Sequence, residues 1–222
     1  MNRLSLLGRA SGAACALALA LSSIAVTADA RPVTYTGGRV LVAEAYPDSL
    51  AWRYGYSGSF RWSASVGGLY VDGFEGQKTL DIHYVRGARL LKRWNWPTAQ
   101  ANVFVWGGAG HARVASQSDV SAHAGFQADF ETRRIYTSLV SEHHEGPNWR
   151  YRTDTVALGL APYEHDFEKT ALWVVLKGMR STHTRDDEPK SAVMLRFFNP
   201  KWWLEVGVQD NGDLLGNVMF NF

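Results

Sequence analysis

The sequence has 222 residues and only one cysteine, Cys15, which lies among the first thirty residues. Those residues have the parts of an export signal: basic residues near the start, an uninterrupted small and apolar core at 13–21, and a small-x-small motif at 28–30. We predict a cleaved signal peptide at 1–30, with a retained membrane helix over 10–27 as the alternative. The mature chain then has no cysteine, which excludes the small disulfide-stapled class of exported proteins.

Long apolar runs are also missing. Beyond the predicted signal, the longest is the six residues Ala171 to Leu176, whereas a membrane-spanning helix needs about 20. No stretch shows the 3.6-residue apolar periodicity of an amphipathic helix. Charge of one sign is not in excess either, with 23 Lys and Arg against 21 Asp and Glu. We therefore exclude a helical membrane bundle and do not expect nucleic acid as a partner.

Aromatic residues are abundant instead, with Trp 9, Tyr 9 and Phe 10. Many occupy alternate positions, as in Leu50, Trp52, Tyr54 and Tyr56, and again from Phe60 onward. Such alternation predicts strands with one apolar and one polar face. A closed barrel of such strands satisfies every backbone hydrogen-bonding group inside lipid. Only alternate residues need to face lipid, which agrees with a mean hydropathy of −0.20.

The last nine residues carry the clearest pattern. One side of this predicted strand holds Leu214, Gly216, Val218, Phe220 and Phe222, and the other holds Asn217, Met219 and Asn221. A terminal Phe preceded by apolar residues at every second position resembles the final strand of Gram-negative outer-membrane β-barrel proteins. The resemblance implies that the apolar side of this strand, from Leu214 to Phe222, is an assembly signal for the barrel-assembly machinery. It also implies that the last strand closes against the first, and that outer-membrane lipids surround the protein.

We predict a periplasmic leader at 31–38 and an all-β, transmembrane, antiparallel up-and-down barrel at 39–222. Twelve strands fit the pattern best. Ten would follow if residues 39–57 lay outside the barrel, and eight if neighbouring segments merged. An even number places both ends in the periplasm. We then expect short turns on that side and longer loops outside the cell; the turns are 131–134 and 198–201, and the loops are 143–148 and 182–190.

Two aromatic pairs are expected at the membrane interfaces, where amphipathic rings prefer to lie. One is Trp202 and Trp203, and the other is Trp149 and Tyr151. The second pair is out of phase with the apolar residues at 156, 158 and 160, and a bulge at 153–155 would reconcile the two.

If the apolar side chains face lipid, the polar ones between them face the lumen. In one segment, Leu80, Ile82 and Tyr84 are expected to face lipid, opposite Asp81 and His83. The interior is then either filled by ion pairs and hydrogen bonds or left as a narrow passage whose basic side chains attract anions. The full set of lumen candidates is Arg53, Arg61, Asp81, His83, Asn102, His123, Gln127, Asp129, Lys177, Arg196 and Glu205.

Enzymatic barrels need a nucleophile, a base within hydrogen-bond reach and an orienting group. The weak catalytic candidates are Ser138, Ser141, His143 and His144, near the outer rim, and no motif of a barrel enzyme accompanies them. The run at 142–145, Glu-His-His-Glu, has the residue types of a metal site. Adjacent residues on a strand point to opposite faces, so we predict neither a metal site nor a cofactor.

These observations together predict a small non-enzymatic pore or structural barrel of the outer membrane, with a lumen of mixed charge. One alternative is an outer-membrane barrel enzyme that acts on lipid or peptide at the outer face. Another is a soluble periplasmic barrel or sandwich, in which the even-numbered aromatics from Trp52 to Trp62 would be buried. The residues indicate no particular solute and no oligomeric state.

Overall fold

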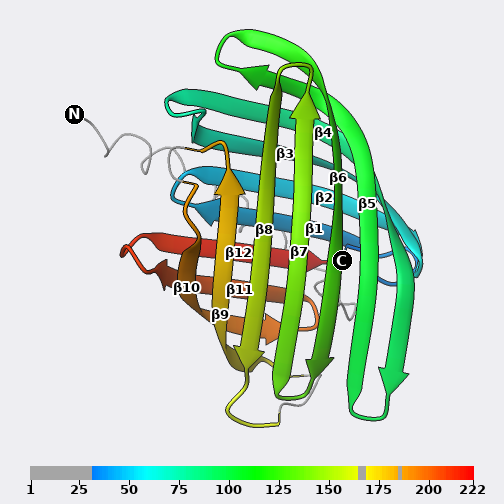
Figure 1. The fold of residues 1–222 in the computed structure, drawn as a ribbon. Coiled ribbons are helices and arrows are strands. Elements are labelled where there is room, and N and C mark those ends of the chain that lie inside the picture. Colours follow the sequence, from blue (N-terminus) through cyan, green and yellow to red (C-terminus); the bar gives the residue numbers. More distant parts are fainter. Residues whose placement is uncertain (1–31, 165–168, 185–186) are drawn as a thin grey trace.

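The computed structural model describes residues 32–164, 169–184 and 187–222, which form one closed antiparallel barrel of twelve strands (Figure 1). Each strand pairs with its sequence neighbours, and β1 pairs with β12 to close the sheet. The predicted fold class and strand number are confirmed, whereas the predicted signal peptide lies outside the described residues. The strands are β1 (Arg39–Tyr46), β2 (Ser49–Ser59), β3 (Trp62–Phe74), β4 (Lys78–Trp96), β5 (Ala99–Val114), β6 (Gln117–Thr132), β7 (Ile135–Gly146), β8 (Trp149–Leu160), β9 (Ala171–Thr182), β10 (Lys190–Asn199), β11 (Trp202–Gln209) and β12 (Leu214–Asn221).

The barrel wall is uneven in height. β4 has 19 residues and β5 and β6 have 16 each, whereas β1, β11 and β12 have 8. The long strands form the tall wall in Figure 1. The seam between β1 and β12 is short, spanning Val40 to Ala45 on β1. It is extended by a reciprocal pair of backbone hydrogen bonds between Arg39 and Phe222, 3.0 and 2.9 Å long.

We call the end that holds Arg39 and Phe222 the terminal end and the opposite one the far end. Most connections at both ends are short turns. The longest, residues 161–170, follows β8 and lies at the terminal end. The expectation that longer connections gather at the opposite end from the termini is therefore wrong for this one. The segment predicted as a loop at 143–148 is largely strand, because β7 extends to the far rim.

Side chains alternate between the two faces of the wall. Along β2, Leu50, Trp52, Tyr54 and Tyr56 are exposed on the outer face, and the residues between them point inward. On β12, Leu215, Asn217, Met219 and Asn221 are buried inside, as the sequence pattern predicts. The outer face is therefore mainly apolar over the middle of the barrel, and buried polar and charged residues gather inside.

The predicted orientation of β4 is wrong. Leu80, Ile82 and Tyr84 of β4 are buried in the interior, so Asp81 and His83 lie on the outer side. Leu80, Ile82 and Tyr84 pack against other inward apolar and aromatic residues at the far end, and together they fill one side of the interior. This cluster is Val71, Phe74, Leu80, Ile82, Tyr84, Ala112, Trp149 and Tyr151.

The pairing of β8 with β7 and β9 is continuous, so the bulge expected at 153–155 is absent. Trp149 and Tyr151 are inward residues that contact Phe74 edge-on, at centroid distances of 6.3 and 6.4 Å. Trp203 is also buried, at 8% exposure. These three rings therefore fill the interior and are not interface aromatics, whereas Trp202 keeps its outward position.

Candidate functional site

The barrel interior holds a cavity of about 300 Å³. Asp48 and Lys190 line it at the far end, and Pro32 lines it toward the terminal end. Its wall combines charged groups with aromatic rings such as Tyr136 and Trp203. A volume of this size is at the small end of the range for ligand sites in proteins.

Glu205 of β11, which is fully buried, is the centre of the first charged cluster. Its carboxylate accepts hydrogen bonds from Lys177 Nζ at 2.5 Å, Arg196 Nε at 2.6 Å and Asn217 Nδ2 at 3.0 Å. Cross-strand pairing brings these groups together, since Glu205 lies opposite Arg196 on β10 and Asn217 on β12. Arg196 also lies over the Tyr136 ring, 4.5 Å from its centroid. Two cations against one carboxylate leave this cluster with a net positive charge.

Glu142 of β7 is the centre of the second cluster. Arg86 Nη1 lies 3.3 Å from both of its carboxylate oxygens, and His144 Nε2 lies 3.1 Å from one of them. The His144 ring stacks on His123 at 5.0 Å, and Tyr84 contacts His123 edge-on at 4.6 Å. Three strands, β4, β6 and β7, supply all five side chains. The cluster therefore fixes the wall opposite the Glu205 cluster through ring packing as well as ion pairs.

Glu44 and Arg53 also line the cavity, from β1 and β2. Both are partly exposed, and neither makes a hydrogen bond or an ion pair with another described residue. They lie on the same face of adjacent strands, in diagonal positions, because Arg53 pairs with Val42 and Glu44 with Ala51. Their charged ends can therefore meet water or a solute in the cavity.

Residues 32–34 occupy the interior at the terminal end. Val33 is 1% exposed and packs in a cluster with Ala88, Leu90, Phe104 and Trp106. The predicted leader thus contributes part of its length to the barrel interior.

Hydrogen bonds from the wall hold this segment in place. Ser57 Oγ accepts from the Thr34 amide at 2.9 Å, and Ser63 Oγ donates to the Pro32 carbonyl at 2.7 Å. The Tyr35 hydroxyl donates to the Phe222 carbonyl at 2.6 Å. Polar and apolar contacts together hold the segment inside this end of the barrel.

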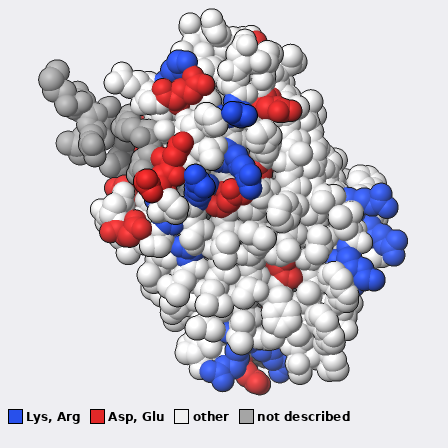
Figure 2. All heavy atoms as spheres, in the orientation of Figure 1, with Lys and Arg blue, Asp and Glu red and all other residues white. Residues whose placement is uncertain are grey.

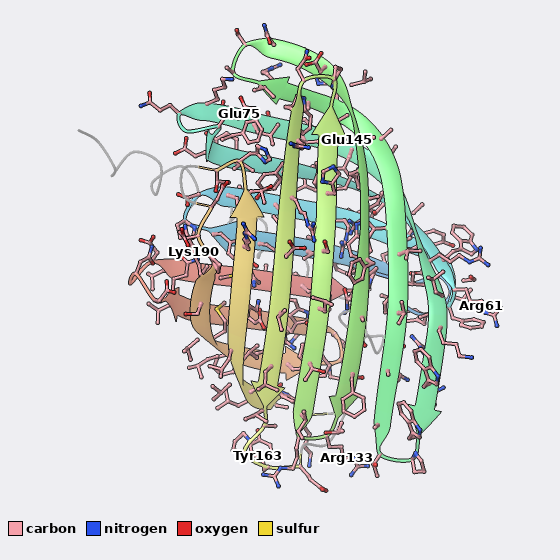
Figure 3. The ribbon with its side chains drawn as sticks, viewed as in Figure 1. Arg61, Glu75, Arg133, Glu145, Tyr163 and Lys190 are labelled. Carbon is pink, nitrogen blue, oxygen red and sulfur yellow. The ribbon has the colours of Figure 1, made fainter. Side chains whose placement is uncertain are left out.

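The far end is narrowed by connections that meet across the mouth. The Glu75 amide, in the turn after β3, donates to the His183 carbonyl, in the connection after β9, at 2.6 Å. Both residues adopt positive φ, 44° and 63°. Lys190 Nζ lies 3.5 Å from Asp48. Glu75 and Lys190 are labelled at this end in Figure 3.

The structure places most predicted lumen residues on the inner face, but not all of them. Arg61 lies in the turn between β2 and β3 and is exposed. Asp81 and His83 face outward because the apolar phase of β4 packs inside. The inward residues are Arg53, Asn102, His123, Gln127, Asp129, Lys177, Arg196 and Glu205. Three of these are joined near the terminal end, where Asp129 accepts hydrogen bonds from Asn102 at 2.7 Å and Gln127 at 2.9 Å.

The four weak catalytic candidates all lie on β7 but do not come together. Ser141 and His143 face outward, whereas Ser138 and His144 face inward. The inward pair is six residues apart along one strand, about 20 Å at 3.4 Å per residue. Within the described chain, no hydrogen bond joins either serine to either histidine.

The cavity residues that the sequence pattern does not predict include Glu44, Tyr84, Arg86 and Glu142. Tyr84 and Arg86 share the phase of Leu80 and Ile82, and a pattern that places this phase against lipid predicts no inward role for them. Glu142 belongs to the polar run at 142–145, in which alternation alone does not single it out. Its inward position follows from the same alternation that separates it from His143.

The described residues contain no group of three or more His, Cys, Asp or Glu side chains arranged to hold a metal ion. Within the same ranges, no helical segment has the length and apolar character needed to traverse a bilayer. No known protein-family profile matches the chain, and no curated protein matches it.

Two solved structures are similar to this barrel. One is described as "KdgM porin in complex with disordered oligogalacturonate", with 10% identity and a TM-score of 0.49. The other is described as "KdgM porin", with 11% identity and a TM-score of 0.47. Each alignment covers 83% of this chain and 99% of the other. We base the functional proposal on the barrel's own side chains.

Proposed function

We propose that this protein is an outer-membrane barrel that forms a narrow, non-enzymatic passage through a lumen of mixed charge. The observation that carries the proposal is the distribution of side chains across the wall. Large apolar residues are exposed on the outer face of most strands, and charged groups such as Glu205 and Arg86 are buried inside. A soluble protein places these two classes the other way round, and lipid reverses the arrangement.

The outer surface also has the zones expected at a bilayer. In Figure 2 the charged atoms gather toward the two ends, and the wall between them is mostly uncharged. Exposed rings lie along this wall, including Trp52 at 41% and Trp62 at 50% exposure. A soluble barrel or sandwich would bury these rings, so their exposure argues against that alternative.

The cavity supports a passage for small polar solutes. It reaches from the Asp48 and Lys190 rim toward Pro32, and Glu44 and Arg53, which form no ion pair with a described residue, present opposite charges to its contents. Charged rings and narrow constrictions set selectivity in membrane pores. Residues 32–34 then act as a stopper at the terminal end, so the described form is a closed one.

Further parts of the proposal concern how the barrel reaches its place. Export through the signal at 1–30, a periplasmic terminal end, and insertion by the assembly machinery through the strand 214–222 follow from the sequence pattern. Outer-membrane lipids are the partners that the exposed apolar wall fits. No observation favours the barrel-enzyme alternative, because the serines and histidines proposed for it lie apart.

Two measurements test the proposal separately. Membrane location predicts recovery in the outer-membrane fraction and a gel mobility that changes on boiling; a soluble product with unchanged mobility would refute it. The passage predicts that replacing Val33 with Asp raises single-channel conductance in planar bilayers, because a buried carboxylate expels residues 32–34. Val33→Ile is the matched control and should behave as the parent. Silence in parent and Val33→Asp alike would refute the passage and leave a filled barrel.

A further inference from the structure

A surface of cations and aromatic rings lies on the outer face near the terminal end. We call it the basic aromatic patch and define it as Arg61, Trp62, Arg89, Lys92 and Trp94. All five side chains are exposed. β3 and β4 bring them together, since Trp62 pairs directly with Arg89. The Lys92 ammonium lies 5.8 Å from the centre of the Trp94 ring.

The patch is basic without compensation. None of its three cations makes an ion pair with another described residue. The outward positions of the neighbouring strand β5 at this level are alanine and valine, such as Ala101 and Val103. In Figure 2, the blue atoms at the right-hand edge, where Figure 3 labels Arg61, have no red atoms beside them.

Outward cations at the far end are arranged differently. Arg113 lies opposite Asp81 in the register of β4 and β5, and Arg150 lies opposite Glu145 in the register of β7 and β8. Arg152 Nη2 lies 2.9 Å from Asp154. Each of these three arginines thus has a carboxylate opposite it or beside it, whereas Arg89 and Lys92 of the patch lie opposite Trp62, Val105 and Val103. The difference in local charge balance is what points to an external anion.

The position of the patch identifies the kind of anion. It lies at the edge of the apolar wall, where Val85, Leu91 and Val66 are exposed. A bilayer boundary at this height brings lipid headgroups to the cations and acyl chains to the apolar residues. Guanidinium groups bind phosphate oxygens through paired hydrogen bonds, and indole rings prefer the headgroup level. Lys and Arg near a membrane surface are attracted to anionic lipids.

We propose that the basic aromatic patch binds the headgroups of anionic phospholipids in the inner leaflet of the outer membrane. The proposal rests on the proposed function, because it needs the terminal end to face the periplasm. Arg61 and Arg89 bind the phosphates, and Lys92, which packs on Trp94, adds positive charge. The Trp62 ring lies at the level of the lipid headgroups. Bound lipid would thus hold the terminal end of the barrel at a set height.

The test uses the full mature protein inserted in vesicles that contain phosphatidylcholine and phosphatidylglycerol. Spin-labelled versions of each lipid report the fraction of lipid that the protein immobilises. At low salt we expect at least a threefold preference for phosphatidylglycerol. The variant R61Q/R89Q/K92Q should lose this preference, and 0.5 M salt should lower it in the parent because salt screens exposed charges.

The matched control is R113Q/R150Q/R152Q, which removes three outward cations from the far end and should keep the preference. Heat-modifiable mobility of each inserted protein reports on the barrel itself, so failure of the proposed function is seen separately. If the patch variant keeps the preference for phosphatidylglycerol, the proposal is overturned. An acidic protein is then the remaining class of partner for the patch. An equal loss in the control also overturns the proposal, since the effect would then be one of total charge.

Discussion

Replacing Glu205 with Gln should destabilise the barrel more than any other single loss of charge in the cavity. The change keeps the side chain's shape but leaves Lys177 and Arg196 without their carboxylate. Removing one partner of a buried ion pair costs about 3–5 kcal/mol, because a buried charge is left uncompensated. Lys177 borders the cavity, where water can reach part of the ammonium. We therefore expect a loss near the lower figure, about 3 kcal/mol of unfolding free energy.

The free energy is measured by denaturant unfolding of the folded protein in micelles, followed by tryptophan fluorescence and by heat-modifiable mobility. Glu44→Gln is the matched control, because Glu44 lines the same cavity but makes no ion pair with a described residue. It should change the unfolding free energy by less than about 1 kcal/mol. Joint replacement of Glu205, Lys177 and Arg196 by Leu or Met should recover most of the loss, because no charge is then left buried. A Glu205→Gln variant within 1 kcal/mol of the parent, as a rough limit, would refute the reasoning.

Three further outcomes are expected. Gly207→Ala should impair folding, because a Cβ there would lie 2.2 Å from a carbonyl oxygen of β10, whereas Gly178→Ala, with open space around it, should fold normally; refolding yield by gel mobility distinguishes them. The backbone and side-chain hydrogen bonds from Ser191 lower the pKa of Asp210, so its contribution to stability is present at neutral pH and is lost as the pH falls through that lowered value. The protection factor of the Ser191 amide, which removes the intrinsic pH dependence of hydrogen exchange, should therefore fall in acid in the parent but vary less with pH in Asp210→Asn. Val33→Asp should raise conductance, and bilayer recordings that match the parent would contradict the stopper.

The two-residue alternation predicted the strand number and the orientation of most strands. It succeeded on β2 and β12 because one face of each meets the apolar surroundings and the other meets polar neighbours. It failed on β4, where Leu80 and Ile82 pack inside against other apolar residues while Val85 and Leu91 face outward. When the barrel interior has an apolar core of its own, apolar residues at alternate positions of a strand do not show which face of that strand meets lipid.

The charged clusters were only partly predictable. Lys177, Arg196 and Glu205 were all predicted to be inward, yet nothing in the alternation joined them. Arg86 and Glu142 are 56 residues apart, and their meeting depends on the stagger of the four strands β4 to β7 in a closed wall. A local pattern fixes the face of a residue, whereas the partner across the lumen is fixed by global geometry.

The Tyr35 hydroxyl links the inserted segment to the seam at which β1 and β12 close the barrel. It joins the inserted segment to Phe222, which is also bonded to Arg39 where the first and last strands meet. That junction is among the briefest ladders in the wall. Withdrawing the segment therefore removes a hydrogen bond at the β1–β12 seam, where the strands are joined by few backbone pairs. Displacing the segment and separating β1 from β12 are therefore mechanically linked in this molecule.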